Sequence, residues 1–261
     1  MSVLKNALEE NVQTFGAWMQ IPSPIIAEIL ASSPLFDWIC IDLEHGAIDI
    51  EKVAELCRVI KMYKKTPIVR IPILDQIWIT RSLDAGAQGI IVPRVNSVDM
   101  AKAAIKFAMY PPDGIRGIGY CHANMHGNEF DEDEIACFNG NLIMVMQIEH
   151  IQGLKNLREI CKVSHIDALF LGPLDLKMSM DKKSKPFDDL ITYYNEVCQA
   201  EDMPYGIHIV DTTNDSISKA IGDGNSMMAL GTDCSLLVDG IVKSDNITGI
   251  FCGVKGSRKY K

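Results

Sequence analysis

The chain has 261 residues, of which 48% are apolar and 23% charged, and its formal net charge is −9. This composition is ordinary for a folded globular protein and excludes collagen, coiled coil and disorder as the main state. No apolar stretch approaches the ~18 residues that span a bilayer, the acidic balance disfavours a nucleic-acid surface, and the N-terminus lacks a signal-peptide core. We therefore expect a cytoplasmic protein with no membrane and no nucleic-acid partner.

Short apolar runs of strand length recur along the chain, each bounded by turn or polar residues. Segments with helical spacing lie between them, and Ser23, Asp49 and Ser97 stand where the N-caps of three of these helices are expected. The runs are Phe15–Met19, Trp38–Ile41, Ile68–Ile71, Ile90–Val92, Leu142–Ile148, Ala168–Leu171, Gly206–Val210 and Met227–Leu230.

Near-continuous apolar strands that alternate with helices indicate a parallel sheet buried on both faces. About eight strand–helix units in a chain of this length predict a (β/α)8 TIM barrel, with residues 1–261 forming a single domain. An open doubly wound sheet is the alternative, but it would favour a glycine-rich turn after the first strand, and the chain has none there. The stretch Tyr110–Asn141 has the least regular pattern, and so long a connection is usually functional.

Eight cysteines invite a disulfide or zinc interpretation, which their spacing does not support. There is no C-x-x-C pair, and Cys57, Cys161 and Cys198 stand inside apolar helical patterns. We expect reduced, buried thiols. A second metal site at Cys121, His122 and His126 is disfavoured as well, because no fourth ligand stands at the usual spacing.

Polar residues follow several of the predicted strands, at the end of a barrel where catalytic residues gather. Glu149 and Asp175 are hard oxygen donors that suit Mg²⁺ or a similar ion, which would polarise a ketone. His45 is the natural general base, Arg70 can stabilise an oxyanion, and Asp84 can hold the imidazole of His45. Each residue taken alone could be a surface cap or an ion pair. The pattern itself therefore predicts a barrel enzyme that uses a metal and goes no further.

Seven segments in a fixed order resemble the HpcH/HpaI aldolases, which are class II, metal-dependent pyruvate aldolases. That group includes 2,4-dihydroxyhept-2-ene-1,7-dioate aldolase and 2-dehydro-3-deoxyglucarate aldolase. The resemblance covers roughly residues 3–245. The segments are FDWICIDLEHG (36–46), VRIP (69–72), LDAGAQGIIVPRV (83–95), YPPDGIRGIG (110–119), QIE (147–149), LGPLDL (171–176) and LGTDCSLL (230–237).

The resemblance implies reversible cleavage of a 4-hydroxy-2-oxo acid to pyruvate and an aldehyde, in the catabolism of aromatic compounds or sugar acids. It implies a divalent cation, Mg²⁺, Mn²⁺ or Co²⁺, and a homohexamer in which C-terminal helices are exchanged between subunits. The residues carried over are Glu149 and Asp175 as metal ligands, His45 as acid/base, Asp84 as its support, Arg70 as enolate stabiliser, and Gln147, Gly172, Pro173 and Leu174 as substrate-binding residues.

The chain departs from the family pattern at Arg94, at His150 and over residues 121–141, all outside the expected metal–enolate centre. Arg94 suggests recognition of an anionic group on the substrate, against the simpler interpretation of a salt bridge at the rim. Two alternatives stay open: a CoA-ester lyase of the citrate-lyase β-subunit or malyl-CoA type, and a barrel without catalytic activity.

Overall fold

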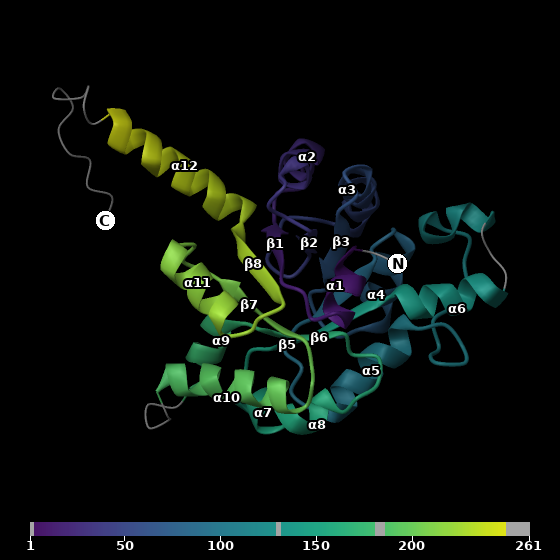
Figure 1. The fold of residues 1–261 in the computed structure, drawn as a ribbon. Coiled ribbons are helices and arrows are strands. Elements are labelled where there is room, and N and C mark those ends of the chain that lie inside the picture. The colour runs from purple at the N-terminus through teal and green to yellow at the C-terminus, as the bar shows by residue number, and fades with distance from the viewer. Residues whose placement is uncertain (1–2, 129–131, 181–185, 249–261) are drawn as a thin grey trace.

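The computed structural model describes residues 3–128, 132–180 and 186–248. Within these ranges eight parallel strands form a closed barrel in which each strand pairs with the next and β8 pairs with β1 (Figure 1). The predicted (β/α)8 barrel is confirmed. The strands are β1 (Thr14–Met19), β2 (Trp38–Asp42), β3 (Thr66–Arg70), β4 (Gly89–Val92), β5 (Ile143–Ile148), β6 (Ala168–Leu171), β7 (Tyr205–Ile209) and β8 (Met227–Thr232).

Helices connect the strands and surround the barrel, except that α12 extends away from it (Figure 1). The helical elements are α1 (Val3–Glu9), α2 (Pro24–Ser32), α3 (Ile50–Met62), α4 (Gln76–Asp84), α5 (Val98–Ala108), the 3₁₀ segment η1 (His122–Gly127), α6 (Glu132–Asn141), α7 (Ile151–Lys155), α8 (Leu157–Cys161), α9 (Pro173–Met178), α10 (Phe187–Ala200), α11 (Asn214–Gly222) and α12 (Asp233–Thr248).

The barrel interior is filled with side chains. Phe170 stands edge-on to both Trp18 and Trp38, with ring centroids 5.8 Å and 6.4 Å apart. Leu4 and Leu8 of α1 belong to the same buried cluster. Parallel strands that are buried on both faces explain why the sequence shows continuous apolar runs instead of alternation. The cluster closes one end of the barrel and leaves the carboxyl ends of the strands as the open end.

The region between β4 and β5 is more regular than the sequence suggests. The prediction of an irregular stretch over Tyr110–Asn141 is wrong for Glu132–Asn141, which forms α6, whereas η1 (His122–Gly127) has non-helical backbone angles at Asn124, Met125 and His126. Helix α6 has only a weak apolar stripe, because Glu, Asp and Asn interrupt it. A helix of that composition gives little periodic signal to detect.

The caps and thiols follow the sequence in part. The Ser97 hydroxyl accepts a hydrogen bond from the Met100 N–H, as an N-cap does, whereas Ser23 and Asp49 stand at N-cap positions without a side-chain bond. The prediction of buried thiols fails at Cys137 and Cys234, which are exposed; Cys252 lies outside the described residues. All cysteines of the described part are free. Within that part, no helix is both long and apolar enough to cross a membrane.

Candidate functional site

A buried ion pair stands at the open end of the barrel, where β2 and β3 finish. Arg70 donates two hydrogen bonds to Asp42, from Nε to Oδ1 at 2.9 Å and from Nη2 to Oδ2 at 2.7 Å. Its guanidinium also lies over the Trp18 ring, 4.2 Å from the centroid. The sequence left an ion pair open as the alternative role of Arg70 but did not single out Asp42. The pair fixes Arg70 and leaves its Nη1 as the nitrogen not bonded to Asp42.

Asp42 also shapes the loop that carries His45. Its Oδ1 accepts hydrogen bonds from the backbone N–H groups of Glu44, at 3.1 Å, and His45, at 3.2 Å. Burial alone would raise the pKa of Asp42, but the hydrogen bonds and charge of Arg70 outweigh burial and lower it. The carboxylate is therefore held in its charged form. The imidazole of His45 stays half exposed at the rim, with Nε2 4.0 Å from Glu44 Oε2.

Glu44 is a second acidic residue for which the sequence suggested no role. Its side chain is only 8% exposed, and its Oε2 lies 3.4 Å from Arg70 Nη1 without a hydrogen bond. Burial is the main cause that raises the pKa of Glu44, and the neighbouring arginines oppose the rise. The burial of Glu44 could not be recognised from the sequence, because a glutamate that follows a strand is usually exposed.

Glu149 follows β5 directly and is almost completely buried. Its Oε2 accepts a hydrogen bond from Gln147 Nε2 at 2.6 Å, and its Oε1 accepts one from the Arg94 N–H at 2.9 Å. Burial, then the negative charges of Glu44 and Asp175, raise the pKa of Glu149 to about 7. The grouping of Glu149 and Asp175 as the two metal ligands stays a prediction.

Asp175 lies in the first turn of α9, which begins with Pro173 directly after Gly172. Gly172 permits the close approach of this turn to the Glu149 side chain. A Cβ atom at position 172 would stand 2.7 Å from Glu149 Oε2 and 2.9 Å from Gln147 Nε2. Leu174 is exposed at the mouth, and its predicted role, binding a substrate carboxylate through its N–H, stays a prediction.

Replacing Gly172 by alanine is expected to displace the Glu149 carboxylate. We expect divalent-cation affinity to fall about tenfold or more and the free energy of unfolding to fall by about 1–3 kcal/mol, because the added methyl group overpacks the contact between residue 172 and the Glu149 side chain. Calorimetric titration and urea unfolding measure the two effects. Gly117→Ala is the matched control, since nothing lies within 4 Å of a Cβ there. Equal behaviour of the two variants would contradict the close packing.

Several buried polar atoms at this end of the barrel have no hydrogen-bond partner in the described structure. They are Trp18 Nε1, Glu44 Oε2, Gln147 Oε1 and His208 Nε2. Two of these atoms, Glu44 Oε2 and Gln147 Oε1, are oxygens near the Glu149 carboxylate, whose pKa is raised. Unpaired oxygens around such a carboxylate indicate that a positive charge would be stabilised there. A divalent cation with oxygen ligands fits such a donor set. No group of three or more metal-ligating side chains occurs among the described residues, so any cation there would need water or substrate as further ligands.

His208 of β7 points into the barrel and was not singled out from the sequence. Its ring centroid lies 5.8 Å from that of Trp18. Burial, and then the charge of Arg70, lower the pKa of His208 to about 4. The imidazole is therefore neutral at physiological pH, which suits a position beside a buried guanidinium. Its strand position was predicted, but its neighbours depend on the barrel register.

His208 is expected to make the protein sensitive to acid. Its folded pKa is lower than its unfolded pKa of about 6.5, so the unfolded state binds a proton first as pH falls. This residue should cost about 2 kcal/mol of stability between pH 8 and pH 5. Between pH 8 and pH 5, the free energy of unfolding of His208→Leu, measured with urea, should therefore rise by about 2 kcal/mol relative to that of the wild type. His165→Asn, at an exposed site, should not; parallel pH profiles for wild type and His208→Leu would refute the idea.

Asp84 has a different partner from the one suggested by the sequence. Its Oδ1 accepts a hydrogen bond from Arg116 Nη2 at 2.6 Å, and the Arg116 guanidinium lies over the Tyr110 ring. No hydrogen bond or ion pair joins Asp84 to His45 within the described chain. The other site residues gather at the barrel mouth, whereas the support of His45 by Asp84 stays a prediction.

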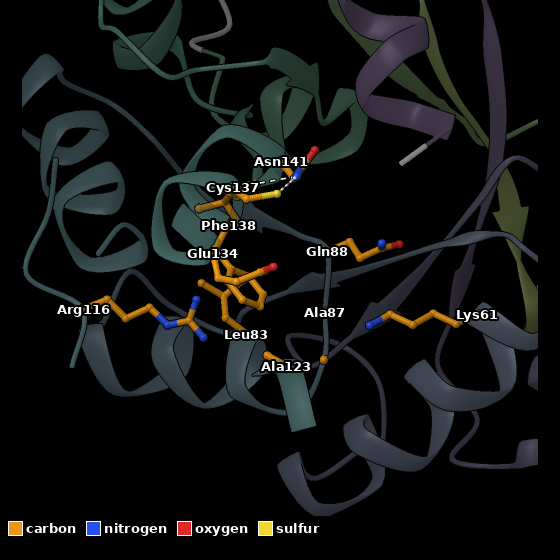
Figure 2. A pocket seen from close by; sticks show the side chains of 12 residues that line it. Lys61, Leu83, Ala87, Gln88, Arg116, Ala123, Glu134, Cys137, Phe138 and Asn141 are labelled. Carbon is orange, nitrogen blue, oxygen red and sulfur yellow. Dashed lines mark hydrogen bonds between the residues drawn. The ribbon is translucent and has the colours of Figure 1, made fainter. Parts of the chain in front are cut away.

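A cavity of about 330 Å³ lies at the other end of the strands (Figure 2). Gln88 and Leu142 in its wall directly precede β4 and β5, so it faces the amino ends of the strands. Lys61 and Arg116 enter it from opposite sides (Figure 2). In barrel enzymes the chemistry takes place at the carboxyl ends. The candidate active site is therefore the mouth that contains Arg70 and Glu149, not this cavity.

A family model described as HpcH/HpaI aldolase/citrate lyase matches residues 14–240. The chain belongs to this family. The resemblance noted in the seven sequence segments is thereby confirmed, and the HpcH/HpaI match covers every strand of the barrel.

Relatives within the HpcH/HpaI family are similar along most of their length. The chain is 32% identical over 248 residues to a 4-hydroxy-2-oxo-heptane-1,7-dioate aldolase of Klebsiella pneumoniae, covering 92% of this chain and 91% of the relative. It is 29% identical over 241 residues to a hydroxypyruvate/pyruvate aldolase of Roseobacter denitrificans, covering 92% and 94%. A HpcH/HpaI aldolase/citrate lyase family protein from Burkholderia cenocepacia superposes with a TM-score of 0.88 at 26% identity, covering 95% and 99% of the two chains.

Proposed function

We propose that this protein is a class II pyruvate aldolase that cleaves a 4-hydroxy-2-oxo acid reversibly to pyruvate and an aldehyde. The observation that carries the proposal is the buried Glu149 carboxylate at the mouth of a closed barrel, bonded to Gln147 and to the Arg94 N–H and with a pKa raised to about 7. The names of the two aldolase relatives support the reaction type. They differ in the substrate they give, so the proposal leaves the aldehyde open.

Glu149 and Asp175 would hold the divalent cation, for which Mg²⁺, Mn²⁺ and Co²⁺ are the candidates. Carboxylate oxygens suit these hard or borderline ions. When bound, such a cation supplies Lewis-acid polarisation of the 2-oxo group. Gln147 would orient Glu149, since its Nε2 donates to Oε2, and its free Oε1 would accept a hydrogen bond from bound water or substrate.

The chain's own groups would manage charge and protons. Arg70 is preorganised, because Asp42 fixes two of its nitrogens and leaves Nη1 to donate to the oxygen on which negative charge develops. His45 would take the proton of the 4-hydroxyl and return a proton to the three-carbon product. Its exposed position at the rim suits that exchange, and Asp42 acts as a positioning residue through the His45 N–H.

A Schiff-base mechanism is not part of the proposal. It needs a lysine inside the barrel, and none of the described strands contains one. Lys5 of α1 is buried at the closed end, where its Nζ donates to the Leu142 carbonyl and pairs with Asp167. This agrees with the sequence-based preference for a metal-dependent reaction.

The proposal includes a cytoplasmic homo-oligomer, with the predicted hexamer and exchanged C-terminal helix. Helix α12 extends away from the barrel (Figure 1). Several of its apolar side chains are exposed. Apolar residues on a projecting helix favour burial against another copy. Light scattering after size-exclusion chromatography tests the state, and a monomer would refute it. The exposed residues are Leu236, Leu237, Val238, Ile241 and Val242.

Proton exchange of pyruvate tests the reaction without a guess at the aldehyde. The protein would be incubated in D₂O with pyruvate and Mg²⁺, Mn²⁺ or Co²⁺, and the methyl signal followed by NMR. We expect metal-dependent loss of the signal, abolished by EDTA and slowed about 100-fold or more in His45→Ala. His165→Asn is the matched control, because His165 is exposed near the closed end.

The outcomes separate the alternatives. Exchange that needs both metal and His45 supports a site that enolises pyruvate. Binding of a divalent cation without exchange would favour a CoA-ester lyase, which a screen of acyl-CoA esters would then detect. Absence of cation binding would favour the barrel without catalytic activity and would overturn the proposal.

A further inference from the structure

Arg94 follows β4 with a backbone conformation that is rare outside glycine. Its φ angle is +54°, in the left-handed region, and its N–H donates to Glu149 Oε1 at 2.9 Å. Residues held in this region cluster at functional sites, because the surrounding contacts must maintain them. Here the backbone bond to Glu149 directs the Arg94 side chain across the mouth.

The Arg94 guanidinium stands against two acidic groups but is not locked to either. Its Nη2 lies 3.6 Å from Glu44 Oε1, and its Nε lies 3.9 Å from Glu149 Oε1. No hydrogen bond joins its side chain to another described residue, and the side chain is 64% exposed. An exposed ion pair at this separation is weak, so moving the guanidinium into solvent costs little. Arg70 differs, since Asp42 holds it by two short bonds.

We propose that Arg94 is an exchangeable counter-ion of the Glu44–Glu149 carboxylates. It neutralises them while no cation is bound, and it is released toward the mouth when a divalent cation takes its place. Once released, its planar guanidinium binds a carboxylate on the acceptor aldehyde. The inference rests on the proposed function, and it assigns this specificity to one residue.

The exchange couples the two ligands. Arg94 opposes the cation electrostatically, because like charges near the same carboxylates repel. An acceptor with its own carboxylate stabilises the released arginine, so it favours the state in which the cation is bound. Linkage requires that the cation favour the acidic acceptor to the same degree. An uncharged aldehyde has no such effect.

Direct Mn²⁺ binding, followed by electron paramagnetic resonance of the free ion, tests the counter-ion role without using activity. Arg94→Gln is expected to bind Mn²⁺ about three to ten times more tightly than the wild type, because a nearby positive charge is removed. Arg94→Lys keeps the charge and should stay close to the wild type. Arg58→Gln on α3 is the charge-matched control away from the mouth, and it should leave the affinity unchanged.

Acceptor selectivity tests the second part. With pyruvate as the other substrate, kcat/KM for a four-carbon aldehyde acid would be compared with that for butanal. We expect the acid preference to fall about tenfold or more in Arg94→Gln and less in Arg94→Lys. Unchanged Mn²⁺ affinity, or unchanged preference, in Arg94→Gln overturns the inference. A wild type that binds no Mn²⁺ overturns the proposed function as well, which distinguishes the two failures.

Discussion

Replacing Glu149 by glutamine is expected to remove divalent-cation binding and to lower kcat/KM at least ~1000-fold. Glutamine keeps the size of the side chain but loses the anionic oxygens that attract the cation. A loss of several kcal/mol of transition-state stabilisation corresponds to that factor. Calorimetric metal titration and initial rates with any substrate that supports turnover measure the two effects.

The control for this variant is Glu159→Gln, which removes a carboxylate of the same type from α8. Glu159 is exposed and pairs with Lys162 at 2.8 Å, away from the mouth. We expect no change in cation affinity there. Cation binding at wild-type strength in Glu149→Gln would exclude Glu149 as a ligand, and the metal site would have to be sought elsewhere.

The same site predicts a proton release that depends on pH. Burial, with the charges of Glu44 and Asp175, raises the pKa of Glu149 to about 7, so at pH 6 the carboxyl group is mostly protonated without a cation. Binding at pH 6 should therefore release close to one proton, and binding at pH 8.5 almost none. Titration in two buffers of different ionisation enthalpy measures this number.

Arg70→Met is expected to lower the free energy of unfolding by about 3–5 kcal/mol, because it leaves Asp42 buried and charged without its partner. Asp42 is fully buried, so water cannot replace the lost hydrogen bonds. Turnover should fall as well, since Nη1 is the donor available to the developing oxyanion. Urea unfolding measures the stability, and the kcat of the folded variant separates the two losses.

The double variant Asp42→Asn/Arg70→Met is the informative control. An uncharged asparagine keeps an oxygen for the Glu44 and His45 N–H groups, so most of the lost stability should return. Turnover should stay low, because the arginine is still missing. If the double variant were as unstable as Arg70→Met, the unpaired charge of Asp42 would not be the cause of the instability.

Strand positions could be predicted because both faces of each strand are buried. The run Ala168–Leu171 is β6 as predicted, and each of the other runs begins and ends within two residues of its strand. The ends of the strands are harder to predict than their centres, because polar residues such as Thr66 and Asp42 also pair within the barrel. Helix α1 was missed. Its Leu4 and Leu8, one turn apart, were the available signal, but only the closed barrel shows that they fill its base.

The site could be predicted by residue type but not by contact. The sequence brought Arg70, Glu149 and Asp175 to one rim, because the carboxyl ends of parallel strands meet there. It could not show that Arg70 donates its hydrogen bonds to Asp42 and not to Glu44, since both acids stand at the carboxyl end of β2. It also could not show that Asp84 binds Arg116, because those residues are brought together by the packing of the loop after α5.

The filled interior of the barrel has a consequence for the order of events. Because Trp18, Trp38 and Phe170 block one end, substrates and products must reach and leave Glu149 through the open end of the barrel. If the protein has the proposed function, the keto-acid half of the substrate binds deepest, against Arg70. The aldehyde half then lies between the keto-acid half and the solvent. The aldehyde must therefore leave first and pyruvate last, and in synthesis pyruvate must enter before the aldehyde can follow.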